Sequence, residues 1–328
     1  IIFNQKGKDI ICVYTAIGKA DVDVKKFSEE IIKGKADGYT IIIAATSSES
    51  APMISIAPAI GCSVAEYFRD QGKNVLLILD DLATHAKYLR EMSLLAGRTP
   101  GRESYPADIF YQHSHLVERA GNFNELMGNG CITLIPLIET DLESFTSLIP
   151  TNVMSMTDGH TLFTSALRAQ GKYPAVDPER SVTRVGRQTQ TLVHKILSDK
   201  IRSLLAEYKE LERFSQFGSE LTGDTQLKLK RGKIAEELIR QETRQYIPPP
   251  IQILLLALIF AGFYDQVEID HVHEKKRMLI DALSTKEEFK TIRETVHEYK
   301  YPDLIEAVKG NMKSLEGIWQ VSDSSKKN

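Results

Sequence analysis

Two carboxylates, Asp80 and Asp81, follow directly on an apolar run in the string VLLILDD. Such a run predicts a buried strand, and ligands of open α/β sheets bind beyond the carboxyl ends of the strands. An Asp in that place suits a Mg²⁺ ion that is held partly through water beside phosphate groups. A strand can also end in Asp simply because the loop that follows it is polar. The pattern alone leaves both interpretations open.

The sequence contains no phosphate-binding loop of the form GxxxxGK[ST]. The chain begins directly before its first apolar run, where such a loop and its helix would already have ended. We therefore expect it to be a piece of a longer protein. The segment 97–113, GRTPGRESYPADIFYQH, has the composition of a turn-rich connection, but as a string it is far more specific.

That segment closely resembles the run after the magnesium aspartate in the paired subunits of rotary ATPases. Other strings match in the same order: AIG (16–18), SAP (50–52), GCSVAEYFRDQGK (61–73), ILDDL (78–82), LIET (137–140), IPTNVMSMTDG (149–159), SVTRVG (181–186) and QFGS (216–219). The chain resembles the α subunit of F-type ATP synthase, well over residues 3–265 and weakly beyond. The resemblance implies a RecA-like P-loop NTPase core without its N-terminal part, that is, without the family's β-barrel and P-loop.

The resemblance also assigns roles to single residues. Catalytic β subunits carry a Glu after the strand-ending glycine, but this chain has Lys19 there, so its own site lacks the main group for activating water. Arg184 in SVTRVG matches the arginine finger that reaches the neighbouring β site, where a guanidinium can meet two phosphate oxygens. Residue type alone would favour a surface ion pair for it. Ser155 and Asp158 match residues bordering the same shared site, although Asp158 before Gly159 is also a good loop signal.

Two glutamines, Gln241 and Gln245, match the pair that flanks the adenine of a bound nucleotide. The family's QGQYSP is here QETRQYIPPP, which is two residues longer. Together with Asp80, as the Mg²⁺ aspartate, they form the implied site for ATP or ADP. Tyr173 and His115 each stand where the family has an arginine. These departures indicate a divergent relative, and they leave open whether it is the main α subunit or a specialised α-like paralogue.

The elements that must position these residues change character along the chain. Apolar, β-branched runs predict strands at 9–17, 39–46, 75–79 and 131–138. Helical spacing between them predicts an α/β layer with a mainly parallel sheet covered on both faces. Helical patterns then predict an all-α C-terminal bundle, at 188–217, 222–243, 251–265, 267–283 and 286–299. We expect domains at 1–190 and 191–321 and a disordered tail at 322–328.

Composition and local signals exclude several kinds of protein and binding site. The 41 basic and 44 acidic residues give a net charge of −3, which excludes the basic surplus that nucleic-acid binding needs. Three isolated cysteines exclude a disulfide framework and a zinc site. The apolar run 251–263 spans about 20 Å as a helix, too short for a bilayer core of about 30 Å, and predicts a buried helix. Ser284 and Glu287 form the pattern of a capping box.

The resemblance implies an enzyme only as a subunit of a proton-transporting two-sector ATPase. Copies of the chain would alternate with β subunits in a hexameric ring around a central γ-type shaft, held by a peripheral stalk. The complex would be peripheral on an energy-coupling membrane, the bacterial inner membrane or the mitochondrial inner membrane. A structural paralogue without nucleotide binding and the B subunit of vacuolar or archaeal ATPases remain alternatives, although QFGS and AIG favour the F-type. Lys19 disfavours a self-sufficient hexameric ATPase.

Overall fold

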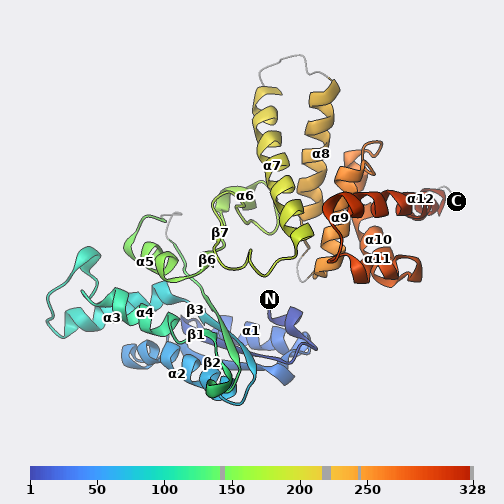
Figure 1. Ribbon diagram of the computed structural model, residues 1–328. Coiled ribbons are helices and arrows are strands. Elements are labelled where there is room, and N and C mark those ends of the chain that lie inside the picture. The colour runs from blue at the N-terminus through green and yellow to red at the C-terminus, as the bar shows by residue number, and fades with distance from the viewer. Residues whose placement is uncertain (141–144, 216–222, 243–244, 326–328) are drawn as a thin grey trace. The chain divides into compact units, whose positions relative to one another are not determined.

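The computed structural model describes residues 1–140, 145–215, 223–242 and 245–325, and the chain divides into two compact units, Ile1–His160 and Thr161–Asn328. In the first unit strands and helices alternate (Figure 1). Its elements are β1 (Ile10–Lys19), α1 (Asp21–Lys33), β2 (Thr40–Thr46), α2 (Ala51–Arg69), β3 (Asn74–Asp80), α3 (Leu82–Leu95), α4 (Ile109–Val117), β4 (Gly121–Asn122), β5 (Cys131–Pro136), α5 (Leu148–Met156) and β6 (Gly159–His160).

A five-stranded sheet in the order β2-β1-β3-β5-β4 forms the first unit's centre. All neighbours pair in parallel except β4, a two-residue antiparallel edge strand. The register sets Ala16 of β1 beside Asp80 of β3, and Lys19 beside Thr46 of β2. The carboxyl ends of the long strands therefore share one edge. The four predicted strands and their parallel arrangement are confirmed, whereas β4 is too short to leave a pattern in the sequence.

Side chains of β1 alternate between the two faces of the sheet. Cys12 and Tyr14 pack in the core beneath α1, while Val13 and Ile17 pack in the core beneath α2 and α3. Figure 1 shows α1 and α2 on opposite sides of the strands. Both faces of β1 are thus covered, which explains why this strand is mainly apolar instead of alternating with polar residues.

Two helices are apolar enough to raise the question of a membrane. Among the described helices, α2 meets the length and composition of a membrane span. Its residues Ile54, Ala57 and Ala65 are buried in the core it shares with the sheet. In the second unit, α9 (Pro249–Ala261) is buried along most of its length, so the buried helix predicted from 251–263 is confirmed.

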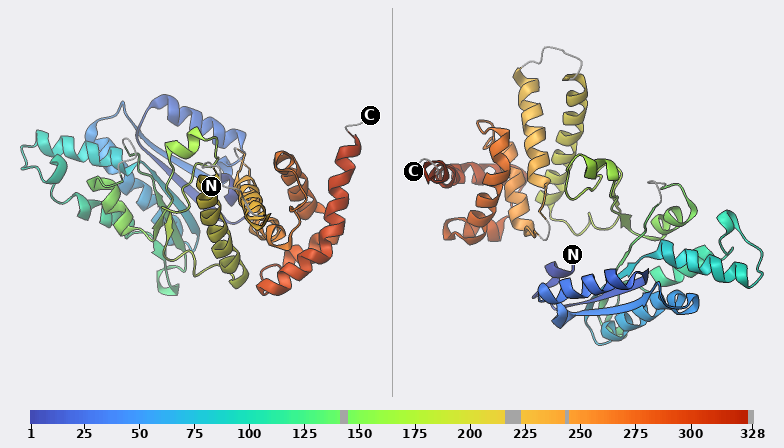
Figure 2. Two further views of the ribbon diagram at one scale, coloured as in Figure 1. Left: turned by 90° about the horizontal axis from the view of Figure 1, so that it is seen from above. Right: turned by 180° about the vertical axis from the view of Figure 1, so that it is seen from behind.

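The second unit is mainly helical, which confirms the predicted all-α region (Figure 2). α7 and α8 lie side by side, and they approach closely where a Cβ on Gly232 would come within 2.4 Å of Tyr208. The unit's other core residues surround α9. Its elements are α6 (Ser165–Ala169), β7 (Val182–Thr183), α7 (Leu192–Ser215), α8 (Gly223–Ile239), α9, α10 (Val272–Thr285), α11 (Lys290–Thr295) and α12 (Tyr301–Ser325).

Some local predictions for the second unit differ from the structure. Ser284 does not cap the helix that follows it: it lies in the last turn of α10, where its hydroxyl donates to the carbonyl of Ile280 at 2.5 Å, so that prediction was wrong. α12 continues to Ser325, into the segment 322–328 that was expected to be a tail. Residues 326–328 and the QFGS string lie outside the described residues.

Candidate functional site

The carboxyl edge of the sheet brings a lysine together with three carboxylates. Lys19 Nζ lies 2.9 Å from Oδ1 of Asp80 and 3.2 Å from Oδ2 of Asp81. It also lies 3.2 Å from Oε1 of Glu139, a residue that follows β5. On the far side of Asp80, the Tyr14 hydroxyl donates to Oδ2 at 2.7 Å. These residues come from three parallel strands or the loops just after them, which is why one edge collects them.

Asp81 has a structural task within this cluster. Its side chain is fully buried and caps α3, where Oδ1 accepts from the Thr84 amide at 2.5 Å and Oδ2 from the Thr84 hydroxyl at 3.1 Å. Burial opposes the charge of Lys19, but the hydrogen bond and the charge of Asp80, followed by those of Asp81, outweigh it and raise the pKa of Lys19. The ammonium therefore stays charged and compensates the buried carboxylate.

The donor set at Asp80 does not fit a magnesium ion beside Lys19. Mg²⁺ requires a near-octahedral set of oxygen ligands at about 2.0–2.1 Å. Both oxygens of Asp80 already have partners, Lys19 on one and Tyr14 on the other. A metal ion on Asp80 would have to displace the ammonium or lie against it, and two cations so close repel each other. The role of Asp80 as a magnesium ligand stays a prediction.

Arg184 lies just after the short strand β7, and its side chain is exposed. The arginines on either side of it are paired: Arg180 Nε lies 2.8 Å from Asp177 Oδ2, and Arg187 Nη2 lies 2.6 Å from Asp199 Oδ2. Within the described parts of the chain, no hydrogen bond or ion pair engages Arg184. The surface ion pair that residue type alone favours is therefore not present among the described residues, and this guanidinium is available to another molecule.

Ser155 and Asp158 are both exposed near the end of the first unit. The Ser155 hydroxyl donates to the carbonyl of Asn152 at 2.6 Å, within α5, and Asp158 lies in the turn before β6. No hydrogen bond between described residues joins either of them to Asp80. Because Arg184 belongs to the second unit, a site shared with it stays a prediction.

The predicted adenine-flanking glutamines follow α8. Gln241 is half-buried, and its backbone N–H donates to the backbone carbonyl of Tyr173 at 2.8 Å. Gln245 is also half-buried, and its side-chain carbonyl accepts from the Glu242 amide at 3.1 Å. Residues 243–244 between them lie outside the described residues. Two positions that depart from the family pattern, Tyr173 and the lengthened glutamine segment, are thus in direct contact.

A buried lysine anchors the start of this segment. Lys276 of α10 donates to the carbonyls of Arg240 and Glu237, which lie at the C-terminal end of α8. A cation is favourable there, because the last carbonyls of a helix lack partners within it. Burial lowers the pKa of Lys276 to about 8. The backbone just before Gln241 is therefore held in place by a side chain from another helix.

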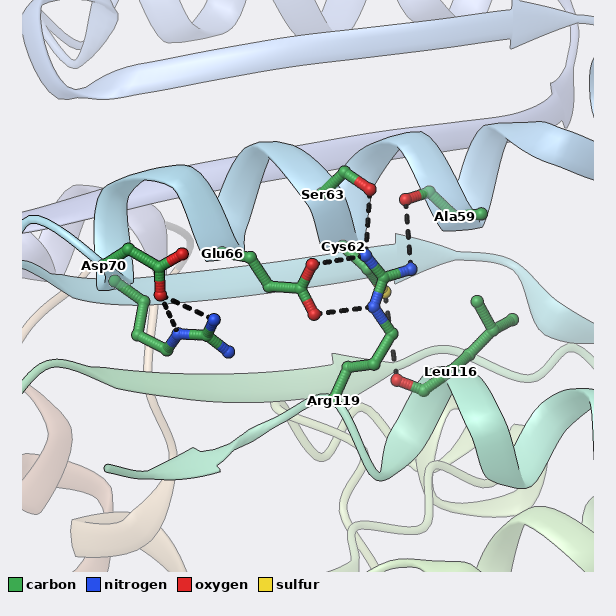
Figure 3. Close-up of polar contacts among 8 residues, drawn as sticks. Ala59, Cys62, Ser63, Glu66, Asp70, Leu116 and Arg119 are labelled. Carbon is green, nitrogen blue, oxygen red and sulfur yellow. Dashed lines mark hydrogen bonds and ion pairs between the residues drawn. The ribbon is translucent and has the colours of Figure 1, made fainter. Parts of the chain in front are cut away.

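An arginine also ties two helices of the first unit together (Figure 3). Arg119 lies just after α4 and makes a two-pronged ion pair with Glu66 of α2, at 2.7 Å through Nε and 2.5 Å through Nη2. Its remaining contacts are to Ser63 Oγ at 2.9 Å and to the Ala59 carbonyl at 3.3 Å. The hydrogen bond to Arg119 lowers the pKa of Glu66. This arginine holds its own protein together, in contrast to Arg184.

Sequence reasoning missed the partners of Lys19. It singled out Lys19 as a replacement for a catalytic carboxylate and Asp80 as a metal ligand, and it did not join the two. A signal was available, because residues at the carboxyl ends of parallel strands meet at one edge of a sheet. A second missed feature is the contact of two buried histidines, His85 and His113, at 3.1 Å. Nothing in their spacing along the chain indicates that contact.

An α/β domain with a mostly parallel sheet and a charged carboxyl edge, followed by a helical domain, is an architecture that nucleotide-binding proteins use, with the ligand beyond the carboxyl ends of the strands. The family model described as ATP synthase alpha/beta family, nucleotide-binding domain, matches residues 1–183. The model described as ATP synthase alpha/beta chain, C terminal domain, matches residues 190–314. This chain belongs to the ATP synthase alpha/beta family.

Its curated relatives include ATP synthase subunit alpha from Clostridium botulinum strains Hall and Kyoto. Each is 40% identical over 301 residues, a stretch that covers 91% of this chain and 59% of the relative. The chain is therefore an alpha-like member of the family and spans less than two thirds of the length of these relatives. The resemblance and the fold class expected from the sequence are both confirmed.

Proposed function

We propose that this chain is a non-catalytic alpha-like subunit in the head of a proton-translocating F-type ATP synthase. In that assembly it alternates with β subunits around a central γ-type shaft, is held by a peripheral stalk, and lies peripherally on an energy-coupling membrane. The observation that carries the proposal is Arg184. It is exposed and without a partner among the described residues, while the arginines on either side of it, Arg180 and Arg187, are both in ion pairs.

In the proposed assembly, Arg184 acts in the catalytic site of the neighbouring β subunit. Negative charge develops on the equatorial oxygens of the transferred phosphoryl group, and a planar guanidinium donates to two of them at once. Mg²⁺ bound with ATP in that site neutralises part of the phosphate charge. Arginine fingers in related nucleotide hydrolases contribute about 10³–10⁵ in rate. Ser155 and Asp158 border the same shared site in this proposal.

The chain's own nucleotide site would be regulatory. Lys19 offers an ammonium where water activation needs a carboxylate, so this site has no general base at that position. Gln241 and Gln245 flank the adenine of bound ATP or ADP in this proposal, and Asp80 lies at the phosphate end. In this proposal Arg184 contributes to catalysis in the neighbouring β site, whereas the chain's own site binds nucleotide without hydrolysing it.

The test uses the full-length protein assembled with its β and γ subunits. Arg184→Ala is expected to lower ATP hydrolysis by the purified complex about 10³-fold or more, without loss of ring assembly. Arg184→Lys should recover little of the rate, because a single ammonium lacks the planar fork. Arg187→Ala is the matched control and should stay close to wild type. A rate for Arg184→Ala within a few-fold of wild type would overturn the proposal.

A second candidate is a structural paralogue that has lost nucleotide binding at its own site. The specific observation in its favour is the ion pair of Lys19 with Asp80. Counting the nucleotides bound per ring separates the two candidates. A regulatory alpha-like subunit adds nucleotide beyond that held by the β subunits, whereas a structural paralogue adds none.

A further inference from the structure

We propose that Lys19 is the resident cation of the carboxyl edge and takes the place that a divalent metal ion would otherwise fill. The Lys19 cluster, as we call it, consists of Lys19, Asp80, Asp81 and Glu139. The inference deepens the proposed function. It rests on that function in one respect only, namely that the carboxyl edge of the sheet is the chain's nucleotide site. Its physical basis is the geometry of this chain alone.

The donor and acceptor groups of the cluster match in number. A lysine ammonium has three N–H donors, and Lys19 has one carboxylate within 3.2 Å for each of them. The side chains of Lys19 and Asp80 are only 20% and 18% exposed, and that of Asp81 is fully buried. Water therefore screens the charges of Asp80 and Asp81 poorly, and the ammonium is the principal compensation for these two carboxylates. Glu139 is 77% exposed, so water screens its charge more strongly.

The covalent tether favours the lysine over a free ion. Lys19 stands at the end of β1, in a strand that pairs with β2 and β3, so its ammonium stays within reach of Asp80. A free Mg²⁺ ion would have to give up tightly held water, and it prefers phosphate oxygens as additional ligands. Tyr14 donates to the second oxygen of Asp80, so each oxygen of this carboxylate already has a partner within the chain.

Removing the charge at position 19 should therefore create the need for a metal ion. In a Lys19→Gln variant the three carboxylates face one another without a cation. Like charges close together destabilise a fold, and a divalent cation that binds only the folded state restores the lost stability. The wild-type chain, which carries its own cation, should gain nothing from Mg²⁺ at this edge.

The experiment follows thermal unfolding of the 328-residue chain, without nucleotide, in EDTA and in millimolar Mg²⁺. We expect Lys19→Gln to lower Tm by roughly 2–4 °C or more in EDTA and to regain most of the loss with Mg²⁺. The wild type should respond to Mg²⁺ no more than the control variant Lys33→Gln, whose lysine pairs with Glu29 on an exposed helix face. Titration with Mn²⁺, followed by electron paramagnetic resonance, should show an added saturable site in Lys19→Gln only.

Two further variants keep the test decisive if Lys19→Gln folds poorly. Lys19→Arg retains the cation and should show no Mg²⁺ response. Lys19→Gln combined with Asp80→Asn removes one of the repelling charges, so it should unfold at a higher temperature than the single variant in EDTA and respond less to Mg²⁺. A wild-type Mg²⁺ response equal to that of Lys19→Gln, or no response in any variant, overturns the inference. The Arg184 test uses the assembled ring, so either proposal can fail while the other stands.

Discussion

Acid should destabilise the first unit through a pair of buried histidines between α2, α3 and α4. His85 Nε2 lies 2.9 Å from the carbonyl of Ser55, which can only accept, so this nitrogen carries the proton. His85 Nδ1 then accepts from His113 Nε2 at 3.1 Å. This leaves His113 Nδ1 as an unprotonated nitrogen, and it is buried without a partner among the described residues. The contacts thus define one neutral tautomer for each ring.

Burial, followed by the charge of His85, lowers the pKa of His113 to about 3, and burial lowers the pKa of His85 as well. The unfolded chain binds these protons below about pH 6.5, whereas the folded chain does not. Stability from His113 is therefore complete above about pH 6.5 and is lost progressively as the pH falls toward 3. Between about pH 7.5 and pH 5, His113 alone should cost about 2 kcal/mol of unfolding free energy, and His85 adds to it.

The assay is urea unfolding at the two pH values, with hydrogen exchange of the α3 and α4 amides to locate the effect. His113→Gln keeps an N–H donor for His85 but cannot titrate, so its loss of stability in acid should be about 2 kcal/mol smaller than that of the wild type. His115→Gln, at an exposed histidine of the same helix, is the control and should behave as the wild type. An equal acid loss in the wild type and His113→Gln would refute the argument.

Two other substitutions test how α2 is held. Gly61→Ala should cost about 1–3 kcal/mol in urea unfolding, because its Cβ would come within 2.2 Å of the buried Thr15 hydroxyl and push α2 from the sheet. Arg119→Met should lower the free energy of unfolding by about 2 kcal/mol, because the half-buried Glu66 carboxylate loses both hydrogen bonds from the guanidinium (Figure 3). It should also raise hydrogen exchange in α4. Unchanged midpoints in either variant would contradict these accounts.

The sequence predicts the strands well because their signal is local. The runs at 9–17, 39–46, 75–79 and 131–138 are apolar almost throughout, as is typical of strands in a parallel sheet that helices cover on both faces. The sheet order follows no local signal, however. It sets Ala16 beside Asp80, and this register is what brings Lys19 to the carboxylates. Lys19 and Asp80 stand out in the sequence, whereas their pairing and their contacts with Glu139 and Tyr14 depend on tertiary structure.

Local signals also mislead where two local structures compete for one side chain. Ser284 and Glu287 have the spacing of a capping box, but the hydroxyl of Ser284 is used by the helix before it, through the carbonyl of Ile280. A serine near a helix end can serve either helix, and the packing of α10 decides which. The His85–His113 contact shows a stronger limit, because it joins two helices that no pattern in the sequence relates.

The two cations that matter most in this chain have opposite surroundings, and this indicates opposite uses. Lys19 has three carboxylates within 3.2 Å, whereas Arg184 has no partner among the described residues. A charge that acts on another molecule must not be neutralised within its own chain, and arginine keeps its charge at every physiological pH while it stands exposed. A charge that stabilises its own fold needs the reverse, namely close partners and little water. We therefore expect substitutions at Lys19 to change the stability of this chain and its response to Mg²⁺, and substitutions at Arg184 to lower the neighbour's catalysis without a loss of this chain's stability.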